Sequence, residues 1–265
     1  MLVSSFTQTY GENRFLELML LKYDVVGNAF RNKCDMIIFS FHNCSKEFVE
    51  AGTRIVTDIY PAEKLKILEY RNISYLETIR RTLDFLKERE FDYVLQIQDD
   101  QHGINSTETI HSLDDIDEMF SFLVKTKPAL LNIFSNEGNP KYNGIKPLEK
   151  HKEINTTFYS YNTKEFQKKR LYAWNDGTYF ARLDFLRGLF SMKLPTDVWG
   201  IEFSLKYFFD KNYLIRWGCD KLYFKASNLH GKNTNKLLTA EDNLKRFFGE
   251  LDAWDEIKTL IPSKL

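Results

Sequence analysis

The chain has 265 residues, of which 43% are hydrophobic and 28% charged, with 37 basic and 37 acidic side chains. This length suits one large α/β domain, and the zero formal charge provides no global field that would recruit nucleic acid or an anionic membrane. The N-terminus lacks the pattern of a signal peptide, and no run approaches the roughly 18 apolar residues of a membrane span. The three cysteines have no metal-binding or redox spacing. We therefore expect a cytoplasmic protein with at most peripheral membrane association.

Short apolar segments alternate with amphipathic ones along the first half of the chain. Apolar residues recur at helical spacing from Leu76 to Leu86, and Ser112 is a plausible N-cap for a helix that reaches Leu123. Strands that alternate with helices of this length predict βαβ units and a mostly parallel sheet. The predicted strands are residues 2–6, 36–41, 65–68, 91–98 and 130–134, and a further helix is predicted near residues 15–21.

The second half of the chain has a different character. Residues 135–169 hold glycines and prolines among many polar residues, which predicts a long functional or mobile loop. Strands are predicted at residues 178–182, 214–217 and 222–224, and helices at residues 184–189 and 201–209. The amphipathic tail from residue 239 predicts a last helix that packs on the domain.

Two adjacent acids, Asp99 and Asp100, directly follow the apolar segment 91–98. A continuous apolar run of this length is typical of a strand buried on both faces of a parallel sheet. Ligands of such sheets gather at the carboxyl ends of the strands, where carboxylates suit a divalent cation that carries phosphates. The turn-like sequence His102-Gly103-Ile104-Asn105 comes next. These features predict a metal and phosphate site at the sheet edge; the alternative is that the two acids only cap a loop.

The order of these segments resembles a nucleotide-sugar-dependent glycosyltransferase of the GT-A fold, similar to family 2. The resemblance covers nearly the whole chain and rests on the strand ending in Ser4-Ser5-Phe6, the helix with Arg80, the acidic pair, residues 176–182, the helix at residues 202–206 and the late His230. It implies an α/β fold with a mixed, mostly parallel central sheet flanked by helices. The single domain of residues 1–265 would comprise a nucleotide-sugar-binding half (1–134), an acceptor and catalytic half (135–238) and a C-terminal amphipathic helix (239–265).

In that fold an Asp-x-Asp signature binds a divalent metal, Mn²⁺ or Mg²⁺, which stabilises the leaving diphosphate as a Lewis acid. By the resemblance, Asp100 is a metal ligand, and Asp99 shares the metal or faces the donor ribose. Gln98 occupies the position of the first acid and is expected on the donor side. The resemblance adds His230 as a metal ligand and Lys232 on the phosphates. Because Gln98 brings no charge, we expect weak metal affinity.

An inverting enzyme of this class needs a general base that deprotonates the acceptor hydroxyl. The candidates are Glu202, Asp197 and Asp176, and Glu202 is slightly favoured over Asp197. The Glu-Asp pair of the family is replaced by Trp199 and Gly200, which leaves the choice open. The alternative is that Asp197 is a helix N-cap and Glu202 a solvent-facing helical residue.

The remaining implied contacts surround the nucleoside and the acceptor. The residues expected around the nucleoside are Ser4, Phe6, Thr7, His42, Asn43 and Arg80. On the acceptor side, Trp174 and Trp199 offer aromatic faces that stack on a sugar ring.

The resemblance implies transfer of a sugar from a nucleotide-diphosphate donor to a glycan, lipid-linked or protein-linked acceptor, as in polysaccharide biosynthesis. A sugar nucleotidyltransferase is one alternative, but it predicts a glycine-rich loop with Arg or Lys after the first strand. The sequence Tyr10-Gly11-Glu12-Asn13-Arg14 offers one glycine there. A carbohydrate- or nucleotide-binding protein that has lost the chemistry is the other alternative, and the degenerate acidic motif is compatible with it.

Overall fold

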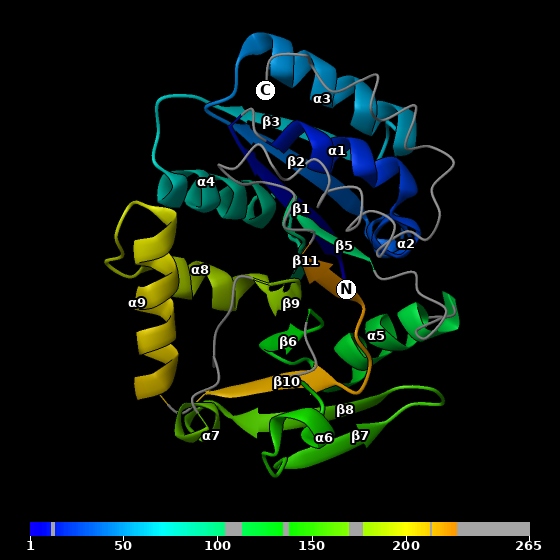
Figure 1. Ribbon diagram of the computed structural model, residues 1–265, viewed down its shortest axis with the longest axis vertical. Helices are drawn as coiled ribbons and strands as arrows, with labels where there is room; N and C mark the ends of the chain where they lie inside the picture. The colour runs from blue at the N-terminus through cyan, green and yellow to red at the C-terminus, as the bar shows by residue number, and fades with distance from the viewer. Residues whose placement is uncertain (12–13, 104–112, 135–137, 170–176, 213, 227–265) are drawn as a thin grey trace, which may run out of the picture.

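A nine-stranded sheet forms the centre of the computed structural model (Figure 1). The structure describes residues 1–11, 14–103, 113–134, 138–169, 177–212 and 214–226. The strand order across the sheet is β3-β2-β1-β4-β9-β6-β10-β8-β7. In chain order these strands are β1 (Val3–Tyr10), β2 (Met36–His42), β3 (Leu65–Tyr70), β4 (Tyr93–Gln96), β6 (Leu130–Asn132), β7 (Glu149–Lys152), β8 (Thr157–Asn162), β9 (Tyr179–Arg182) and β10 (Ile215–Cys219).

The sheet is mixed and mostly parallel, as predicted. Strands β3, β2, β1 and β4 are parallel neighbours, whereas β9 is antiparallel to both β4 and β6. Strand β10 is parallel to β6, and β8 is antiparallel to β10 and β7. Only β9 and β8 therefore oppose the common direction within this sheet. Strand β5 (Gln101–Gly103) directly follows the acidic residues and forms a separate antiparallel pair with β11 (Phe224–Ala226).

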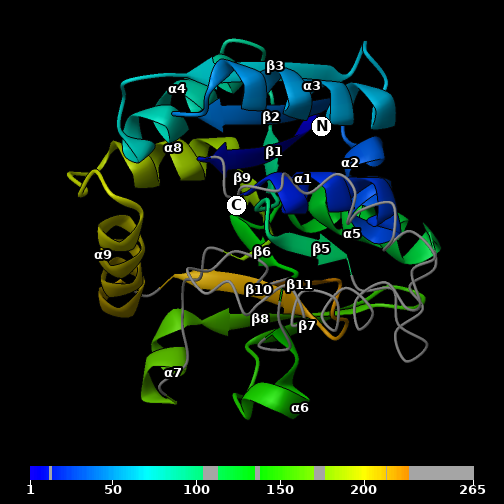
Figure 2. The same ribbon diagram turned by 45° about the horizontal axis from the view of Figure 1, so that its top comes forward.

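Helices cover both faces of the sheet (Figures 1 and 2). Because side chains alternate along a strand, β1 directs Phe6 into a core with α4, α8 and α9, and Val3 into a core with α2 and α5 on the opposite face. The helices are α1 (Phe15–Leu20), η2 (Leu21–Tyr23), α2 (Val25–Lys33), α3 (Lys46–Ile59), α4 (Tyr75–Lys87), α5 (Leu113–Thr126), α6 (Pro140–Asn143), α7 (Thr163–Lys168), α8 (Leu183–Ser191) and α9 (Val198–Lys211).

The predicted long loop at residues 135–169 is wrong. The described part of this region contains α6, β7, β8 and α7. Pro140 begins α6, and Gly144 ends it with a left-handed φ of 63°. These two residues mark the ends of a short helix, so they do not indicate a structureless segment. Strand β8 buries Phe158 and Tyr161, whereas β7 carries the mostly exposed sequence EKHK at the sheet edge and has no apolar alternation to reveal it.

Two further predictions need correction at the ends of strands. Strand β1 continues beyond Phe6 to Tyr10, and the chain turns at Gly11, whose φ is 77°. The His102-Gly103 segment, predicted as a turn, belongs to β5. Helices α2 and α3 are absent from the predicted elements, whereas the strands and helices predicted at residues 65–134 and 178–217 are present with shifted ends.

Strands from both predicted halves of the chain join the same sheet. Strand β6, from the first half, lies between β9 and β10, which both come from the second half. The predicted N-cap Ser112 and the predicted helix at residues 239–265 lie outside the described residues. Among the helices that are described, none is long and apolar enough to cross a membrane.

Candidate functional site

Asp99 and Asp100 lie just beyond the carboxyl end of β4, and only 5% and 8% of their surfaces are exposed. Arg14, which precedes α1, reaches both acids. Its Nε lies 3.7 Å from Asp99 Oδ2, and its Nη1 lies 3.3 Å from Asp100 Oδ2. The same Nη1 is 3.8 Å from Oε1 of Glu17, one turn along α1. One guanidinium thus neutralises charge on a cluster of carboxylates.

The environment of Asp99 disfavours its ionised form. Burial is the largest cause and raises the pKa of Asp99 well above 3.8; Asp100 and Glu17 raise it further, and Arg14 lowers it. Burial acts against the charge of Arg14 as well, but the neighbouring carboxylates produce a net rise in the pKa of Arg14. A desolvated carboxylate beside other carboxylates is suited to take up a further cation or a proton, and such groups cluster at functional sites.

We expect Asp99→Asn to raise the free energy of unfolding by about 1 kcal/mol at pH 7, because a neutral amide replaces a desolvated charge. The pKa of Asp99 is raised in the folded state, so its ionisation opposes folding as the pH climbs from 3.8 through the folded-state pKa. The gain should therefore vanish near pH 3.8, where both proteins are neutral at this position. Urea unfolding from pH 4 to pH 8 tests this; a variant less stable than wild type throughout contradicts it.

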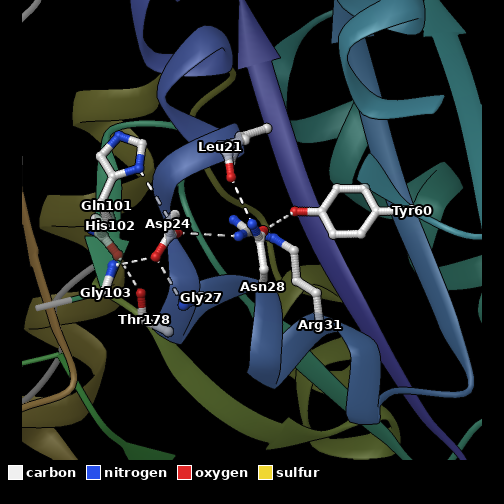
Figure 3. A network of polar contacts seen from close by, with 10 residues as sticks. All are labelled: Leu21, Asp24, Gly27, Asn28, Arg31, Tyr60, Gln101, His102, Gly103 and Thr178. Carbon is white, nitrogen blue, oxygen red and sulfur yellow. Dashed lines mark hydrogen bonds and ion pairs between the residues drawn. The ribbon is translucent and has the colours of Figure 1, made fainter. Parts of the chain in front are cut away.

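A buried network around Asp24 holds the segment that follows the acidic pair (Figure 3). Asp24 is the N-cap of α2, and its Oδ1 accepts hydrogen bonds from the backbone N–H groups of Gly27 and Gly103, each at 2.8 Å. Its Oδ2 lies 3.3 Å from Arg31 Nη1 and 3.8 Å from His102 Nδ1. Burial acts to raise the pKa of Asp24, but the nearby His102 imidazole, the charge of Arg31 and the hydrogen bond from the N–H of Gly27 produce a net lowering.

The close approach of β5 to α2 requires glycine at position 103. A Cβ on Gly103 would lie 2.4 Å from Val26 Cβ and 2.8 Å from the backbone nitrogen of Gly27. Two residues earlier on β5, Gln101 Oε1 accepts a hydrogen bond at 2.7 Å from Oγ1 of Thr178, the residue before β9. Strand β5 is therefore held both to α2 and to the start of β9, which in turn fixes the chain directly after Asp100.

A second polar group faces a cavity on the opposite side of β1 and β4. Its polar members are Gln8 of β1, Gln96 at the end of β4, Gln98 two residues beyond that end, and Glu202 of α9. The cavity has a volume of about 50 Å³. Its remaining walls come from β1, β9, α4, α8 and α9, namely Phe6, Tyr75, Ile79, Leu83, Tyr179, Leu186, Phe190, Val198, Ile201 and Leu205.

The two predicted catalytic residues that the structure describes, Glu202 and Asp197, have different surroundings. Glu202 is half-buried and lines the cavity with Gln98. Asp197 is exposed, and its Oδ1 accepts a hydrogen bond from the N–H of Gly200 at 2.8 Å as the N-cap of α9. Four predicted site residues lie outside the described residues. They are the candidate base Asp176, the predicted metal ligand His230, the predicted phosphate contact Lys232 and the predicted acceptor contact Trp174.

Arg80 and Asn43, both predicted to contact the nucleotide-sugar donor, hold neighbouring segments of the protein together. Arg80 of α4 donates from Nε to the carbonyl of Phe190 at 2.8 Å and from Nη2 to the carbonyl of Met192 at 3.0 Å. It thus satisfies carbonyls at the end of α8. Asn43 has a φ of 53°, and its Oδ1 accepts from the N–H of Asn72 at 3.0 Å. Contacts of these two side chains with a nucleotide-sugar donor stay predictions.

The residues predicted at the end of the first strand lie further inside it. Ser4 and Thr7 are buried within β1, and Phe6 is a core residue that also lines the cavity. Because β1 ends at Tyr10, the residue of this strand that meets the cavity nearest the sheet edge is Gln8. His42 does end β2, where its Nε2 lies 2.8 Å from the carbonyl of Ile73.

Helix α9 carries a line of exposed aromatic side chains. Trp199, Phe203 and Tyr207 are 69%, 62% and 64% exposed, and a spacing of four residues places them on the same side of the helix. Trp199 was predicted as an acceptor contact, whereas Phe203 and Tyr207 were not. Their period of four in the sequence is the signal that would have revealed them.

Arg14, Glu17 and Gln8 are site residues that the sequence analysis did not single out. Arg14 lies in the loop after the first strand, the place where a nucleotidyltransferase was expected to carry a basic residue. Gln8 is separated by one residue from Phe6, so strand alternation assigns both to one face. That signal identifies a buried amide only once β1 is known to extend to Tyr10.

No family model matches the chain, and no curated protein matches it. Among solved structures, residues 1–349 of S. aureus TarS are similar, with a TM-score of 0.50 and 13% identity over 95% of this chain and 67% of that one. A UDP-glucose pyrophosphorylase complexed with UDP-glucose gives 0.48 and 13%, over 91% and 98% of the two chains. The mannosyltransferase PcManGT from Pyrobaculum calidifontis, in complex with GDP-Man and Mn²⁺, gives 0.42 and 12%, over 76% and 49%.

The fold is GT-A-like. At identities this low the likeness concerns the fold alone, and the chemistry has to be argued from the residues at the carboxyl ends of β1 and β4.

Proposed function

We propose that this protein is a glycosyltransferase that moves a sugar from a nucleotide-diphosphate donor to a glycan or glycoconjugate acceptor. The observation that carries the proposal is the buried pair Asp99 and Asp100, which directly follows Gln98 beyond β4. Gln98 itself lines a cavity with other amides and Glu202. Ligands of parallel sheets bind at this edge. Carboxylates there suit the cation that a leaving diphosphate needs, and Glu202 is a candidate base for the acceptor hydroxyl.

The residues present fit a divalent metal in part. Asp99 and Asp100 supply carboxylate oxygens, the ligands that Mg²⁺ and Mn²⁺ prefer. No cluster of three or more His, Cys, Asp or Glu side chains suited to a metal occurs among residues whose positions are described. When bound, the metal would supply Lewis-acid stabilisation of the diphosphate. The guanidinium of Arg14 already pairs with both acids, so a metal would compete with Arg14 for the same carboxylate oxygens.

This competition gives a testable result for Arg14→Ala. We expect the free energy of unfolding to fall by about 2–4 kcal/mol at pH 7, because buried carboxylates lose their counter-charge. We also expect Mn²⁺ to raise the melting temperature of the variant more than that of wild type, since binding to the folded state stabilises it by mass action. Differential scanning fluorimetry with and without Mn²⁺ measures both effects.

The matched control is Arg81→Ala, which removes an exposed ion pair with Glu77 one helical turn away. Such a pair is worth about 0–1 kcal/mol, so neither stability nor the Mn²⁺ response should change much. Equal Mn²⁺ responses in wild type and Arg14→Ala contradict the competition.

A sugar nucleotidyltransferase is the second candidate function, and Arg14 is the observation in its favour. Arg14 comes from the loop after β1 and lies beside the acidic pair, as a nucleotidyltransferase predicts. That function also predicts a glycine-rich loop, whereas this loop contains one glycine, Gly11. The products distinguish the two reactions. A glycosyltransferase releases a nucleoside diphosphate from a nucleotide sugar, whereas a nucleotidyltransferase forms the nucleotide sugar and releases pyrophosphate from a nucleoside triphosphate and a sugar phosphate.

The first experiment is a thermal-shift panel of nucleoside diphosphates and nucleotide sugars, each with and without Mn²⁺. Selective stabilisation by one base identifies the donor, because ligands of the folded state raise its stability. Donor hydrolysis or transfer that disappears in Asp100→Ala supports the enzyme. Binding without turnover, in the presence of suitable acceptors, supports a protein that has lost the chemistry, and no response to any nucleotide overturns the proposal.

A further inference from the structure

Gln8 presents a buried amide that lacks a partner. Its side chain lines the cavity between β1, β4, α4, α8 and α9, and only 7% of the residue is exposed. Neither Oε1 nor Nε2 of Gln8 has a hydrogen-bond partner among the residues that the structure describes. Burying an amide in this way is costly, because the group has left water without replacing its hydrogen bonds. An unpaired buried amide at the functional edge of the sheet indicates a ligand that completes it.

The composition of the cavity defines the chemistry of that ligand. Gln8, Gln96 and Gln98 each offer a donor and an acceptor, and Glu202 adds an acceptor. No Lys, Arg or His is found among the described residues that line the cavity, so a phosphate or carboxylate would meet no counter-charge there. Hydroxyl groups both donate and accept hydrogen bonds, so they can pair with the amides, and they bring no charge into the cavity. The cavity therefore suits a neutral ligand that carries several hydroxyls.

The volume limits how much of the ligand enters. About 50 Å³ exceeds the roughly 30 Å³ that one water molecule occupies in the liquid, but it does not hold a whole disaccharide. It accommodates one edge of a sugar ring, with its hydroxyls on the amides. The apolar walls formed by side chains such as Phe6, Ile79 and Leu205 suit the C–H groups of such a ring.

We propose that this cavity binds the hydroxyl-bearing edge of an uncharged sugar ring and that Gln8 is a specificity-determining residue for it. This inference rests on the proposed function for the source of the sugar, which is either the donor or the acceptor. Gln8 and the acidic pair Asp99 and Asp100 are separate contacts. Sugar recognition by Gln8 and cation-dependent nucleotide binding by the pair can therefore be measured independently.

The test compares wild type with Gln8→Leu, using the free monosaccharides glucose, galactose, mannose and N-acetylglucosamine as probes. Ligand-observed NMR should show a selective response to one of them with wild type and a loss of that response with Gln8→Leu. The variant should also melt a few degrees higher than wild type without ligand, because an apolar side chain replaces an unsatisfied amide. Binding of nucleoside diphosphates should be unchanged.

Thr9→Val is the matched control. Thr9 lies on the same strand with its side chain on the opposite face, and its buried Oγ1 also has no partner within the described part of the chain. This variant should gain stability as Gln8→Leu does but keep the sugar response. If Gln8→Leu does not fold, Gln96→Leu, at a half-buried wall position, takes its place.

Competition identifies the source of the sugar. A donor site predicts that the matching nucleotide sugar displaces the free monosaccharide, and an acceptor site predicts that both bind together. An unchanged monosaccharide response in Gln8→Leu overturns the inference, and so does a wild-type protein that binds nucleoside diphosphates but no sugar. A protein that binds monosaccharides but no nucleotide would instead overturn the proposed function and leave the cavity assignment intact.

Discussion

Replacing Asp24 by Asn is expected to lower the free energy of unfolding by about 3–5 kcal/mol at neutral pH, because it leaves a buried cation without its counter-charge. Arg31 is fully buried, and Asp24 is the carboxylate 3.3 Å from its Nη1. Asparagine keeps an oxygen that accepts from the N–H groups of Gly27 and Gly103, so the two backbone hydrogen bonds persist. The substitution therefore isolates the charge. Urea unfolding monitored by circular dichroism measures the loss.

The pH dependence has a definite sign. The pKa of Asp24 is lowered from 3.8 in the folded state, so its contribution to stability is complete above 3.8 and is lost as the pH falls through the folded-state pKa. The difference between wild type and Asp24→Asn should thus be constant from pH 7 to about pH 5 and shrink only in stronger acid.

The control is Asp84→Asn, since Asp84 forms an exposed ion pair with Arg187 at 3.0 Å. We expect a change of about 0–1 kcal/mol for that variant. Similar losses for the two aspartates would show that the Asp24 network has no special weight. A large loss for Asp24→Asn with unchanged Mn²⁺ binding would show that the network stabilises the fold without positioning Asp100.

The half of the fold built on parallel strands could be predicted because its signals are local. The apolar run that forms β4 and the helical period of α4 are visible in the sequence, and both elements are present. Strand β7 has no such signal, because an edge strand needs no buried face and its sequence, EKHK, is charged. Strand β8 was hidden by the glycines and prolines before it, of which Pro140 and Gly144 mark the ends of α6. Tertiary pairing decides such segments.

The candidate site could be predicted only in part, because only some of its residues are marked by a local sequence pattern. The acids Asp99 and Asp100 directly follow a recognisable strand, so their place at the sheet edge follows from local sequence. Arg14 reaches them from a loop that lies far away in the chain, and no local pattern specifies that contact. The state of Gln8 depends on helices α4, α8 and α9, which close over its strand and separate its amide from water. Burial of this kind arises only in the assembled fold.

Glu202→Gln is expected to reduce kcat for sugar transfer by roughly 10²–10⁴-fold, the usual contribution of a general base. Glu202 and Gln98 line the same cavity, whereas Asp197 is exposed and accepts a hydrogen bond from the N–H of Gly200. This geometry favours Glu202 as the base. The variant should bind nucleoside diphosphates as wild type does, and the rise of kcat/KM with pH that reports base ionisation should disappear.

Asp197→Asn separates the two candidates, because asparagine caps a helix as well as aspartate does. The end of α9 and the stability of the protein should therefore be preserved, and kcat should stay within a few-fold of wild type. The opposite pattern, in which Asp197→Asn loses kcat and Glu202→Gln keeps it, would assign the base to Asp197. It would also mean that the acceptor hydroxyl reacts at the exposed start of α9, beside the aromatic line that begins at Trp199, and not over the cavity.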